Sequence, residues 1–385
     1  MLRYLTAGES HGPCLTTIIE GLPAGLGVTA EAINAQLERR QQGYGRGPRM
    51  LLERDRVRIT SGVRGGLTLG SPVCLEIENK DWENWHECMA AGKDANLEVR
   101  KITQPRPGHA DLAGGIKYRH QDLRNVLERA SARETAARVA AGSVARIFLE
   151  ALGVVINSHV VRIGNICADY ADLDLGNLAK AAQSPVRCID EAKTQEMLKV
   201  ISQAVQAGDS LGGVFEVLVD NVPAGIGSYA HWDRRLDGLL SQAVLSIPGI
   251  KGVEFGLGFK GASMAGSKVH DEIAYSEDLG FHRRTNNAGG IEGGMSNGQR
   301  IVVRAAMKPI PTMVNSLQSI DIVTKYPAKA AVERSDICAV PAAAVVGEAV
   351  VAFTLAQAFL EKFGGDYMEE IFANVARYRG YERQV

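Results

Sequence analysis

The stretch SARETAARVAAGSVARIFLEAL, residues 131–152, predicts a helix in which small residues occupy most of the circumference. Neighbouring elements can approach such a helix closely from several sides, so we expect it at the centre of the fold. Ser131 and Glu134 have the Ser-x-x-Glu spacing of a capping box, which indicates a helix start at Ser131. The helical pattern also extends back to residue 122, and a start near Leu123 is the alternative.

The start of this helix carries charge that suits an anion. A start at Ser131 would offer free backbone N–H groups and the positive end of the helix dipole to a ligand. Arg129 and Arg133 lie on either side of that point. The alternative is a surface helix in which these two arginines pair with Glu128 and Glu134.

Strand and helix patterns alternate on both sides of the central helix. Residues 29–42 predict a helix with Thr29 as N-cap and Gly43 as terminator. The other expected elements are strands at 13–20, 57–61, 72–78, 213–220, 253–259 and 300–307, and helices at 192–207, 341–363 and 366–377. Long connections through helices favour a mixed α/β or α+β sandwich. No linker-like segment divides the chain, so residues 1–385 are expected to form a single domain.

Two segments 200 residues apart suggest an internal repeat. GLPAGLG at 21–27 resembles NVPAGIG at 221–227, and each follows an apolar run and precedes a helical pattern. A fainter similarity pairs LGSPV at 69–73 with AGSKV at 265–269. Unless these similarities are chance, the chain contains two related β-turn-α halves inside one domain.

Composition argues against several kinds of partner. The formal net charge of the 385 residues is −1, whereas proteins that bind nucleic acid or membrane surfaces usually have a broad basic excess. The longest apolar run, residues 339–359, contains Pro341, Gly347 and Glu348, and we interpret it as a buried helix. The N-terminus has no apolar signal region, and the six cysteines show no metal-ligand spacing. A cytoplasmic protein with reduced thiols and no metal is therefore expected.

The segment RRQQGYGRGPRM, residues 39–50, is a local cluster of four arginines with three glycines and no acid. Arginine clusters bind oxyanions, and the glycines would let the loop bend over a ligand. Residues 39–64 contain eight arginines and two acids, so a polyanion binder is one alternative. Such a binder would show a steep salt dependence.

Two short motifs contain histidines beside glycines. GESHG at 8–12 contains His11, and RPGHAD at 106–111 contains His109. Glycine allows a ligand to approach the backbone closely, and histidine can act as a general acid near neutral pH. A turn with a hydrogen-bonded or solvent-facing histidine is the alternative for each motif.

Three further motifs lie in the second half of the chain. GGIEGGMSNG at 289–298 has five glycines in ten residues, so its backbone either turns sharply or lies against a ligand. KPIPT at 308–312 has two prolines that make the backbone rigid, and Lys308 suits a phosphate. In RSDIC, Arg334 and Asp336 would share one face of an extended segment. A flexible glycine-rich loop and an exposed ion pair are the alternatives.

In this order, GESHG, RRQQGYGRGPRM, RPGHAD, LERASARETAARVAAG, GGIEGGMSNG with KPIPT, and RSDIC resemble the motifs of the chorismate synthase family, over residues 4 to about 340. The resemblance implies an α+β fold: a β-α-β sandwich with central helices between two mainly antiparallel sheets. It implies a homotetramer. It also implies a lyase of the shikimate pathway that converts 5-enolpyruvylshikimate 3-phosphate to chorismate and phosphate by anti-1,4-elimination. Such a lyase requires reduced FMN, with no net redox change.

The resemblance also implies the functional residues. His11 matches an acid near the substrate phosphate, His109 an acid that protonates the reduced flavin, and Asp336 an acceptor of a flavin proton. The implied substrate-binding residues are Ser10, His11, Arg40, Arg46, Arg49, Arg106, Ser131, Arg133 and Arg334. The implied cofactor-binding residues are Arg40, Arg46, Arg129, Ala130, Ser131, Pro248, Gly249, Gly293, Lys308, Pro309, Ile310, Pro311, Thr312 and Arg334. Many relatives have Arg-His-Asp-Pro where this chain has Arg-Ser-Asp-Ile at 334–337.

The chemistry of the reaction agrees with these residue types. A substrate with one phosphate and two carboxylates has a charge of roughly −4, and arginine binds such groups while staying protonated. NADPH is a candidate reductant that Arg40 and Arg46 would contact. No reductase domain is visible, so an external flavin reductase is expected. A conventional flavin oxidoreductase that consumes NADPH is a further alternative. Arg39 has no such role and is expected to stabilise the C-terminus of its helix.

Overall fold

Two antiparallel sheets frame the computed structural model, which describes residues 1–47, 52–168 and 175–385. The first sheet has the order β1 (Arg3–Ala7), β2 (Cys14–Glu20), β6 (Val73–Glu78) and β3 (Val57–Ser61). The second has the order β10 (Ile250–Phe255), β15 (Ile301–Met307), β9 (Gly213–Asp220), β7 (Val155–Ile163) and β8 (Ile166–Cys167). In β2 and β6 every second side chain is buried, because a strand alternates its faces. The expected α+β class with antiparallel sheets is confirmed.

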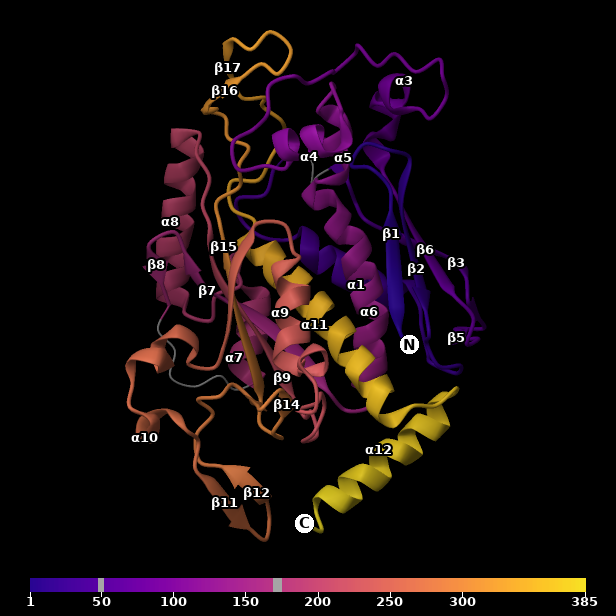
Figure 1. Ribbon diagram of the computed structural model, residues 1–385, viewed down its shortest axis with the longest axis vertical. Coiled ribbons are helices and arrows are strands. Elements are labelled where there is room, and N and C mark those ends of the chain that lie inside the picture. Colours follow the sequence, from indigo (N-terminus) through magenta and orange to yellow (C-terminus); the bar gives the residue numbers. More distant parts are fainter. Residues whose placement is uncertain (48–51, 169–174) are drawn as a thin grey trace.

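Helices stand between the two sheets (Figure 1). They are α1 (Ala30–Gln41), α6 (Thr135–Ala151), α9 (Leu236–Leu245) and α11 (Val340–Phe363). α6 packs on β2 and β6, α11 packs on β7 and β9, and the two helices pack on each other. By length and composition α11 could cross a membrane, but 89% of its apolar window is buried inside the protein. It is therefore the buried core helix that the sequence predicts.

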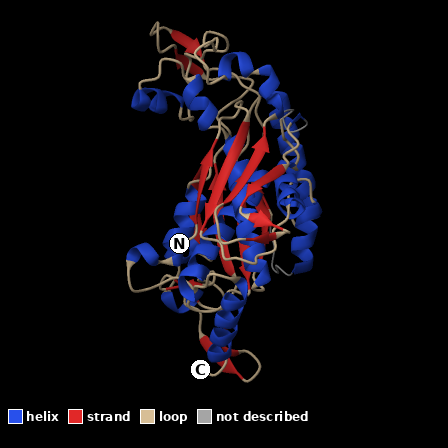
Figure 2. Cartoon of the chain, turned by 90° about the vertical axis from the view of Figure 1, so that its right-hand side faces the viewer, coloured by secondary structure: helices blue, strands red, loops and turns tan. Residues whose placement is uncertain are grey.

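Smaller elements extend this framework. The remaining helices are α3 (His86–Met89), α4 (Asp111–Tyr118), α5 (Arg124–Arg129), α7 (Leu175–Gln183), α8 (Glu191–Ala207), α10 (Gly266–Val269) and α12 (Met368–Glu382). Four short hairpins are formed by β4 (Val63–Arg64) with β5 (Leu67–Thr68), β11 (Ile273–Ser276) with β12 (Gly280–Arg283), β13 (Ile291–Glu292) with β14 (Met295–Ser296), and β16 (Gln318–Ile320) with β17 (Pro327–Lys329). The hairpins β11–β12 and β16–β17 extend from opposite ends of the long axis (Figure 2).

The predicted helix at 122–152 is interrupted by one extended residue. α5 ends at Arg129, Ser131 has φ −68° and ψ 144°, and a 3-10 turn over Ala132–Glu134 leads into α6. Ser131 Oγ accepts the backbone N–H of Arg133 at 3.2 Å, so the predicted cap is present. Glu134 pairs instead with Arg138 at 2.9 Å, four residues later. Both predicted starts therefore exist, but they belong to two separate helices.

The close contact of α6 with α11 depends on a residue without a side chain. A Cβ atom on Gly142 would lie 2.4 Å from the carbonyl oxygen of Ala349 and 2.5 Å from its Cβ. Both distances are shorter than real Cβ contacts, so only glycine allows this approach. Twelve of the 17 residues of α6 are buried, and this confirms the central helix predicted from its small residues.

A buried carboxylate joins the central helices to the second sheet. Glu348 of α11 is 2% exposed and bonds to Arg39 of α1 at 2.7 and 2.8 Å. It also accepts bonds from Arg146 at 2.7 Å, Arg187 at 3.2 Å and the Ser158 hydroxyl at 2.5 Å. Burial raises the pKa of Glu348, but the three guanidinium groups outweigh burial and hold it at about 2. Arg39 lies in the last turn of α1, where a cation is favoured, and its guanidinium also binds α11.

The internal repeat extends to whole sheets. The order β1-β2-β6-β3 is reproduced by β7-β9-β15-β10, with antiparallel pairing throughout. A helix follows the second strand of each set, α1 in one and α9 in the other. The third strand of each set precedes a central helix, α6 or α11. The two halves of the chain therefore fold alike.

The same hydrogen bonds recur in the two repeated segments. Leu26 N donates to Thr68 Oγ1 at 2.9 Å, and Ile226 N donates to Ser296 Oγ at 2.8 Å. The Thr68 hydroxyl donates to the carbonyl of Pro23, and the Ser296 hydroxyl donates to the carbonyl of Pro223, at 2.6 Å in both halves. GVRGGLTLG, starting at Gly62, thus corresponds to GIEGGMSNG in the second half. The predicted similarity between LGSPV and AGSKV is wrong. The segment that starts at Gly62 corresponds instead to a segment that lies 228 residues later in the chain.

Replacement of Gly142 by alanine should destabilise the fold. Helix propensity alone favours alanine by about 1 kcal/mol, whereas overpacking costs about 1–3 kcal/mol. Gly380→Ala in α12 is the matched control, because a Cβ there meets nothing within 4 Å. We expect urea unfolding to show a lower midpoint for Gly142→Ala and an equal or higher one for Gly380→Ala. A Gly142→Ala protein as stable as the wild type would show that the helices can separate without cost.

Glu348 should contribute stability that acid removes. Its pKa lies at about 2 in the folded protein, below the 4.5 of an unperturbed glutamate, so the contribution is complete above pH 4.5 and is lost as pH falls towards 2. Glu348→Gln leaves three arginines around an uncharged group, which should cost about 3–5 kcal/mol at pH 7. The exposed Glu20, paired with Arg3 at 2.5 Å, provides the control Glu20→Gln, for which we expect less than about 1 kcal/mol. Equal unfolding free energies for both variants at pH 7 would contradict this.

Candidate active site

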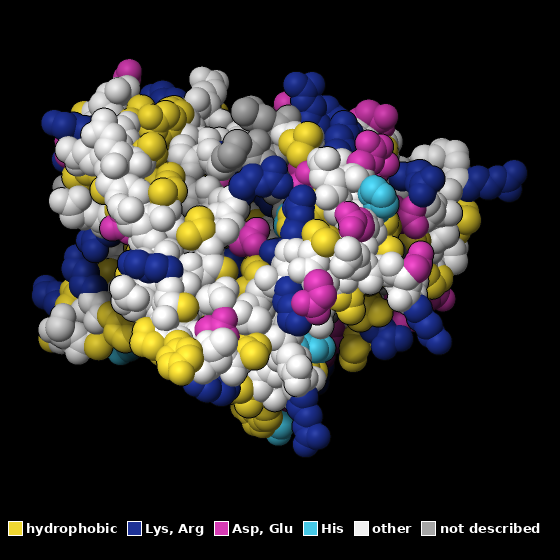
Figure 3. Space-filling view, turned by 90° about the horizontal axis from the view of Figure 1, so that it is seen from above, with side chains coloured by type: hydrophobic (Ala, Val, Ile, Leu, Met, Phe, Trp, Pro, Cys, Tyr) yellow, Lys and Arg dark blue, Asp and Glu magenta, His cyan; other side chains and the backbone are white. Residues whose placement is uncertain are grey.

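A cavity of about 520 Å³ lies at the end of the molecule where α6 and α11 begin. Figure 3 looks onto this end, where Lys and Arg side chains border a hollow in the surface. The volume lies within the range of about 300–1,000 Å³ that small-molecule sites occupy. Thr135 at the start of α6 and Ala342 and Ala343 at the start of α11 line the cavity. Since the N-terminal end of a helix carries partial positive charge, both helices favour an anion here.

The cavity brings together most of the site residues predicted from the sequence. Those that line it are Ser10, His11, Arg40, Arg46, Arg106, His109, Ala130, Ser131, Arg133, Pro248, Gly249, Lys308, Pro309, Ile310, Pro311, Thr312, Arg334 and Asp336. They come from both halves of the chain, and most belong to loops or to the first turns of helices. The motifs other than GGIEGGMSNG therefore converge at one place.

His11 lies in the cavity wall with its ring held on two sides. Its Nδ1 atom is 2.9 Å from Glu128 Oε1, and its backbone N–H donates to Glu128 Oε2 at 2.7 Å. The ring stacks on Trp85, with 3.7 Å between centroids. The Ser10 hydroxyl next to it lies 3.1 Å from the Ser131 hydroxyl, so the GESHG loop meets the start of α6.

Arg40 and Arg133 share one buried carboxylate. Asp55 accepts a bond from Arg40 at 2.7 Å and another from Arg133, and both arginines are at least nine-tenths buried. Burial raises the pKa of Asp55, but the two guanidinium groups outweigh it, so the pKa is lowered. The Nε atom of Arg40 is buried without a hydrogen-bond partner. A ligand oxygen in the cavity would satisfy such a donor.

A second histidine is combined with an arginine and an acid in the RPGHAD turn. Asp111 begins α4 and accepts from Arg106 Nε at 2.8 Å, and its other oxygen lies 2.6 Å from His109 Nδ1. Burial opposes the charge of Asp111, but hydrogen bonds from His109 and Arg106 hold its pKa well below the usual range. Arg106 also donates to Thr312 at 2.8 Å. This bond ties the turn to the KPIPT segment.

Asp336 binds the loop that contains Arg46 and Gly47. Its carboxylate binds Arg46 Nη1 at 2.6 Å and accepts the Gly47 N–H at 2.6 Å. A Cβ on Gly47 would lie 2.7 Å from the Ser335 carbonyl, so glycine permits this approach. Arg334 pairs with Asp81 rather than with Asp336. The alternative of an exposed ion pair between Arg334 and Asp336 is therefore not observed, because each side chain binds another partner.

Lys308 closes one side of the cavity beside the predicted cofactor segments. Its ammonium donates to the Gly108 carbonyl, and its backbone N–H donates to the Gly249 carbonyl at 2.9 Å. Burial, and then the neighbouring Lys251, lower the pKa of Lys308. Lys251 also lines the cavity, although it was not predicted.

Three predicted residues are not among those that line the cavity. Arg49 lies outside the described residues. Arg129 is exposed and donates to the carbonyls of Thr6 and Gly8, so it supports the GESHG loop from outside. Gly293 forms the turn of the β13–β14 hairpin, at the opposite end of β15 from the cavity. Seven residues of strand separate the two, or about 20 Å.

The site residues that the sequence patterns do not predict are mainly acids. Asp55, Asp81 and Glu128 each hold a cavity arginine or histidine. Glu128 was considered only as a partner of Arg129 or Arg133. The pairing of Arg129 and Arg133 with Glu128 and Glu134 is wrong, since Glu128 binds His11 and Arg133 binds Asp55. No spacing connects these acids with their partners, because they meet only through the fold.

Three described arginines of the cluster, Arg39, Arg40 and Arg46, bind acids inside the protein. Arg54, Arg56, Arg58 and Arg64 are exposed, and Arg58 pairs with Glu76 across the first sheet. Nucleic acid requires guanidinium groups that face solvent and phosphates, and the three inner arginines do not meet this requirement. Arg40 and Arg46 line the cavity, where they can bind a small anionic ligand.

Comparisons with known proteins show the family of the chain. The chorismate synthase family model matches residues 2–360. The chain is 63% identical to a chorismate synthase of Desulforudis audaxviator (strain MP104C) over 379 residues, which cover 98% of this chain and 97% of that one. It is 58% identical to the enzyme of Moorella thermoacetica (strain ATCC 39073 / JCM 9320) over the full length of both. A crystal structure of chorismate synthase superposes with a TM-score of 0.82 and 46% identity, covering 100% of this chain and 99% of the other. The chain therefore belongs to the chorismate synthase family.

Proposed function

We propose that the cavity is the active site in which the chain converts 5-enolpyruvylshikimate 3-phosphate to chorismate and phosphate. The observation that supports this most directly is the set of cationic side chains around it: Arg40, Arg46, Arg106, Arg133, Lys251, Lys308 and Arg334. Two histidines, each bound to a carboxylate, lie in the same wall. A substrate with a phosphate and two carboxylates matches this set of charges.

The arginines can bind this substrate while they remain bound to the acids of the protein. A guanidinium has five N–H donors, and the carboxylates of Asp55 and Asp111 occupy only some of them. The remaining donors of Arg40 and Arg106 would bind substrate oxyanions. Buried carboxylates fix the directions of these side chains before the substrate arrives, so less is lost on ordering them. Ser10 and Ser131 add hydroxyl groups at the same wall.

The cavity also suits reduced FMN, which this family of phosphate-eliminating lyases uses. Lys308 and Arg334 are cations for its phosphate, and the buried Arg40 Nε is a donor without a partner. The prolines of KPIPT and the Pro248–Gly249 turn form a rigid apolar wall for a flat ring system. When bound, reduced FMN supplies electron density to the substrate ring as phosphate leaves.

Three residues would manage protons. His11 is the proposed acid at the substrate phosphate, and its burial beside Glu128 keeps water away from that position. His109 is the proposed acid at the cofactor, where Asp111 and Arg106 hold its ring. Asp336 is the proposed proton acceptor, and Arg46 and Gly47 fix its carboxylate. Ser335 and Ile337 flank this acid and leave those contacts in place.

Assembly and reduction of the cofactor are further parts of the proposal. We propose a homotetramer in the cytoplasm, formed by chains that each fold as one domain. Gly293 is too far from the cavity of its own chain to contact a cofactor there, so such a contact would come from another subunit. We also propose that the reductant is external, from a separate flavin reductase that uses NADPH.

An anaerobic assay tests the proposed function. With chemically reduced FMN and 5-enolpyruvylshikimate 3-phosphate, we expect chorismate and phosphate in equal amounts, because elimination breaks one C–O and one C–H bond. With oxidised FMN and NADPH alone, we expect no product until a flavin reductase is added. NADPH consumed in proportion to substrate would indicate an oxidoreductase instead. If reduced FMN gave no product, the proposed function would be wrong.

Removal of either histidine should slow turnover. General acids contribute about 10²–10⁴-fold, so we expect losses of this size in kcat for His11→Ala and for His109→Ala. His231→Ala is the control, since His231 also binds an acid, Asp233, at 2.6 Å but is exposed and distant in the fold. Steady-state kinetics under anaerobic conditions, with unfolding curves for each variant, measure the effect. Turnover of His11→Ala or His109→Ala equal to that of His231→Ala would remove the acid role of that histidine.

A further inference from the structure

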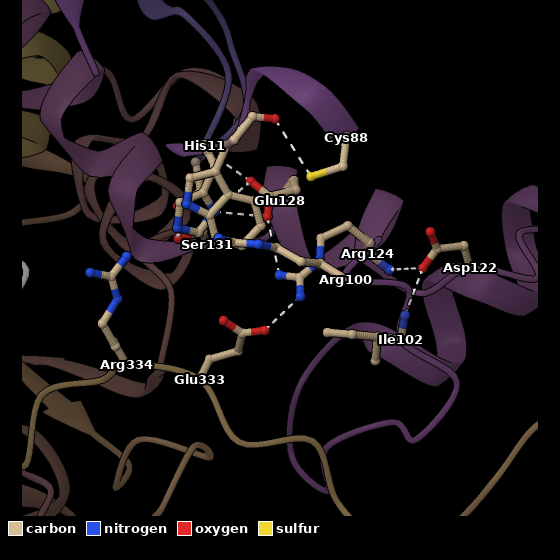
Figure 4. A network of polar contacts seen from close by, with 12 residues as sticks. His11, Cys88, Arg100, Ile102, Asp122, Arg124, Glu128, Ser131, Glu333 and Arg334 are labelled. Carbon is tan, nitrogen blue, oxygen red and sulfur yellow. Dashed lines mark hydrogen bonds and ion pairs between the residues drawn. The ribbon is translucent and has the colours of Figure 1, made fainter. Parts of the chain in front are cut away.

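Glu128, in the last turn of α5, is a buried acid directly behind His11 (Figure 4). Its side chain is 1% exposed. An acid close to a site for anions repels the ligand, so the position of Glu128 behind the cavity wall requires another explanation. Its contacts with His11 supply one: the carboxylate binds both the backbone N–H at 2.7 Å and ring Nδ1 at 2.9 and 3.0 Å.

These contacts determine which ring nitrogen carries a proton. Burial raises the pKa of Glu128, but hydrogen bonds from His11 and the charge of Arg124 outweigh it, so the pKa is lowered and the group is ionised at neutral pH. An ionised carboxylate only accepts hydrogen bonds, so His11 Nδ1 must donate. Nε2 is then the nitrogen available to a ligand. Its nearest charged group is Asp81 Oδ2 at 3.9 Å, beyond hydrogen-bond distance.

The plane of the His11 ring is fixed as well. Trp85 stacks on it with 18° between the planes, and the guanidinium of Arg100 lies 3.8 Å from the centroid of the Trp85 ring. The indole N–H donates to Asp81 at 3.2 Å, so Trp85 is itself held in place. The backbone, Nδ1 and one ring face are therefore all constrained, and Nε2 can point in only one direction.

Glu128 is supported in turn from outside the cavity. Arg124 lies 3.4 Å from Glu128 Oε1 and donates to Glu333 at 2.8 Å (Figure 4). The charged groups around His11 are thus Glu128 and Asp81 next to the ring, with Arg124, Arg100 and Arg334 behind them. This series of contacts from Arg124 through Glu128 to His11 resembles the arrangement in which a carboxylate holds a catalytic histidine in one tautomer.

We propose that Glu128 is a positioning residue for His11, which holds a proton on Nδ1 and aims the Nε2–H bond at the phosphate of the substrate. The proposal rests on the proposed role of His11 as an acid. The acid is the imidazolium form of His11, which carries protons on both Nδ1 and Nε2. When the C–O bond breaks, its electron pair goes to the phosphate oxygen, and the Nε2 proton passes to the departing phosphate. The ring is left neutral with its Nδ1–H still bound to Glu128, and no proton moves to the carboxylate.

Glu128→Gln tests this with little change in shape. The amide can turn either its oxygen or its NH₂ group towards Nδ1, so the proton position is no longer determined. We expect kcat to fall about 10²-fold or more, since loss of the correct tautomer costs up to about 10⁴-fold in a comparable triad. KM should change much less, because the arginines that bind the substrate are untouched. In the double variant His11→Ala/Glu128→Gln, kcat should be no lower than in His11→Ala alone.

A buried pair in the second sheet provides a matched control. Glu216 binds His159 at 3.0 Å and Arg304 at 2.7 Å, with its side chain 1% exposed, so Glu216→Gln also removes a charge from a buried His–Glu–Arg group. It lies outside the cavity wall, and we expect its kcat per folded enzyme to equal that of the wild type. If Glu128→Gln does not fold, Glu128→Asp retains the charge but shortens the reach by one methylene, and we expect an intermediate loss.

Nitrogen-15 NMR of histidine-labelled protein gives a readout independent of turnover. At a pH at which the His11 ring is neutral, its signals, identified by their loss in His11→Ala, should show a protonated Nδ1 in the wild type and a mixture of tautomers in Glu128→Gln. Unchanged kcat in Glu128→Gln, losses that multiply in the double variant, or unchanged His11 signals would each overturn the proposal. A wild type that makes no chorismate would refute the proposed function, whereas the NMR comparison would still decide the role of Glu128.

Discussion

The contact of α6 with α11 at Gly142 is the constraint on which the rest of the structure depends. Each half of the chain forms a four-stranded antiparallel set and ends in one of these helices. Because the helices touch without side chains between them, the two sheets share one core. The helices also start at the same end, where both line the cavity. Packing of the repeat thus creates a place where two positive helix ends meet.

Charge inside the protein is paired: the buried acids bind bases, and several of them bind more than one. Glu348 binds three arginines outside the cavity lining, and Asp55 binds Arg40 and Arg133 beside the cavity. An isolated buried charge is costly, whereas a hydrogen-bonded group of opposite charges is tolerated. At Glu348 the donors are used within the protein, and the result is structural. At Asp55 the arginines border open space, so donors such as Arg40 Nε remain for a ligand.

Local pattern explains why the helices and most strands could be predicted. The alternation of buried side chains in β2 and β6 and the small residues of α6 depend only on residues that are close in the sequence. Tertiary contacts do not change these patterns. The break at Ser131 was ambiguous, because residues on both sides favour helix and a tertiary contact with Ser10 decides. The second half of the repeat was partly misaligned, since its hairpin glycines are similar to those of the first half at a spacing other than 200 residues. The acids were missed because Glu128 and Asp55 meet their partners only in three dimensions.

The two histidines differ in the hydrogen-bond partners of their Nδ1 atoms. His11 Nδ1 faces only a carboxylate, so a single proton position satisfies the geometry. His109 Nδ1 lies 2.6 Å from an oxygen of Asp111 and 3.0 Å from Nη2 of Arg106, one an acceptor and the other a donor. A proton on Nδ1 satisfies Asp111, and Arg106 Nη2 then keeps its bond to Asp111 Oδ1 at 3.0 Å; without that proton, Nδ1 can accept from Arg106. In the proposed roles, His11 would present a fixed donor to the substrate, and His109 would exchange its proton with little rearrangement. That difference suits one acid at a leaving group that departs once and another beside a cofactor that must return to its starting state in each turnover.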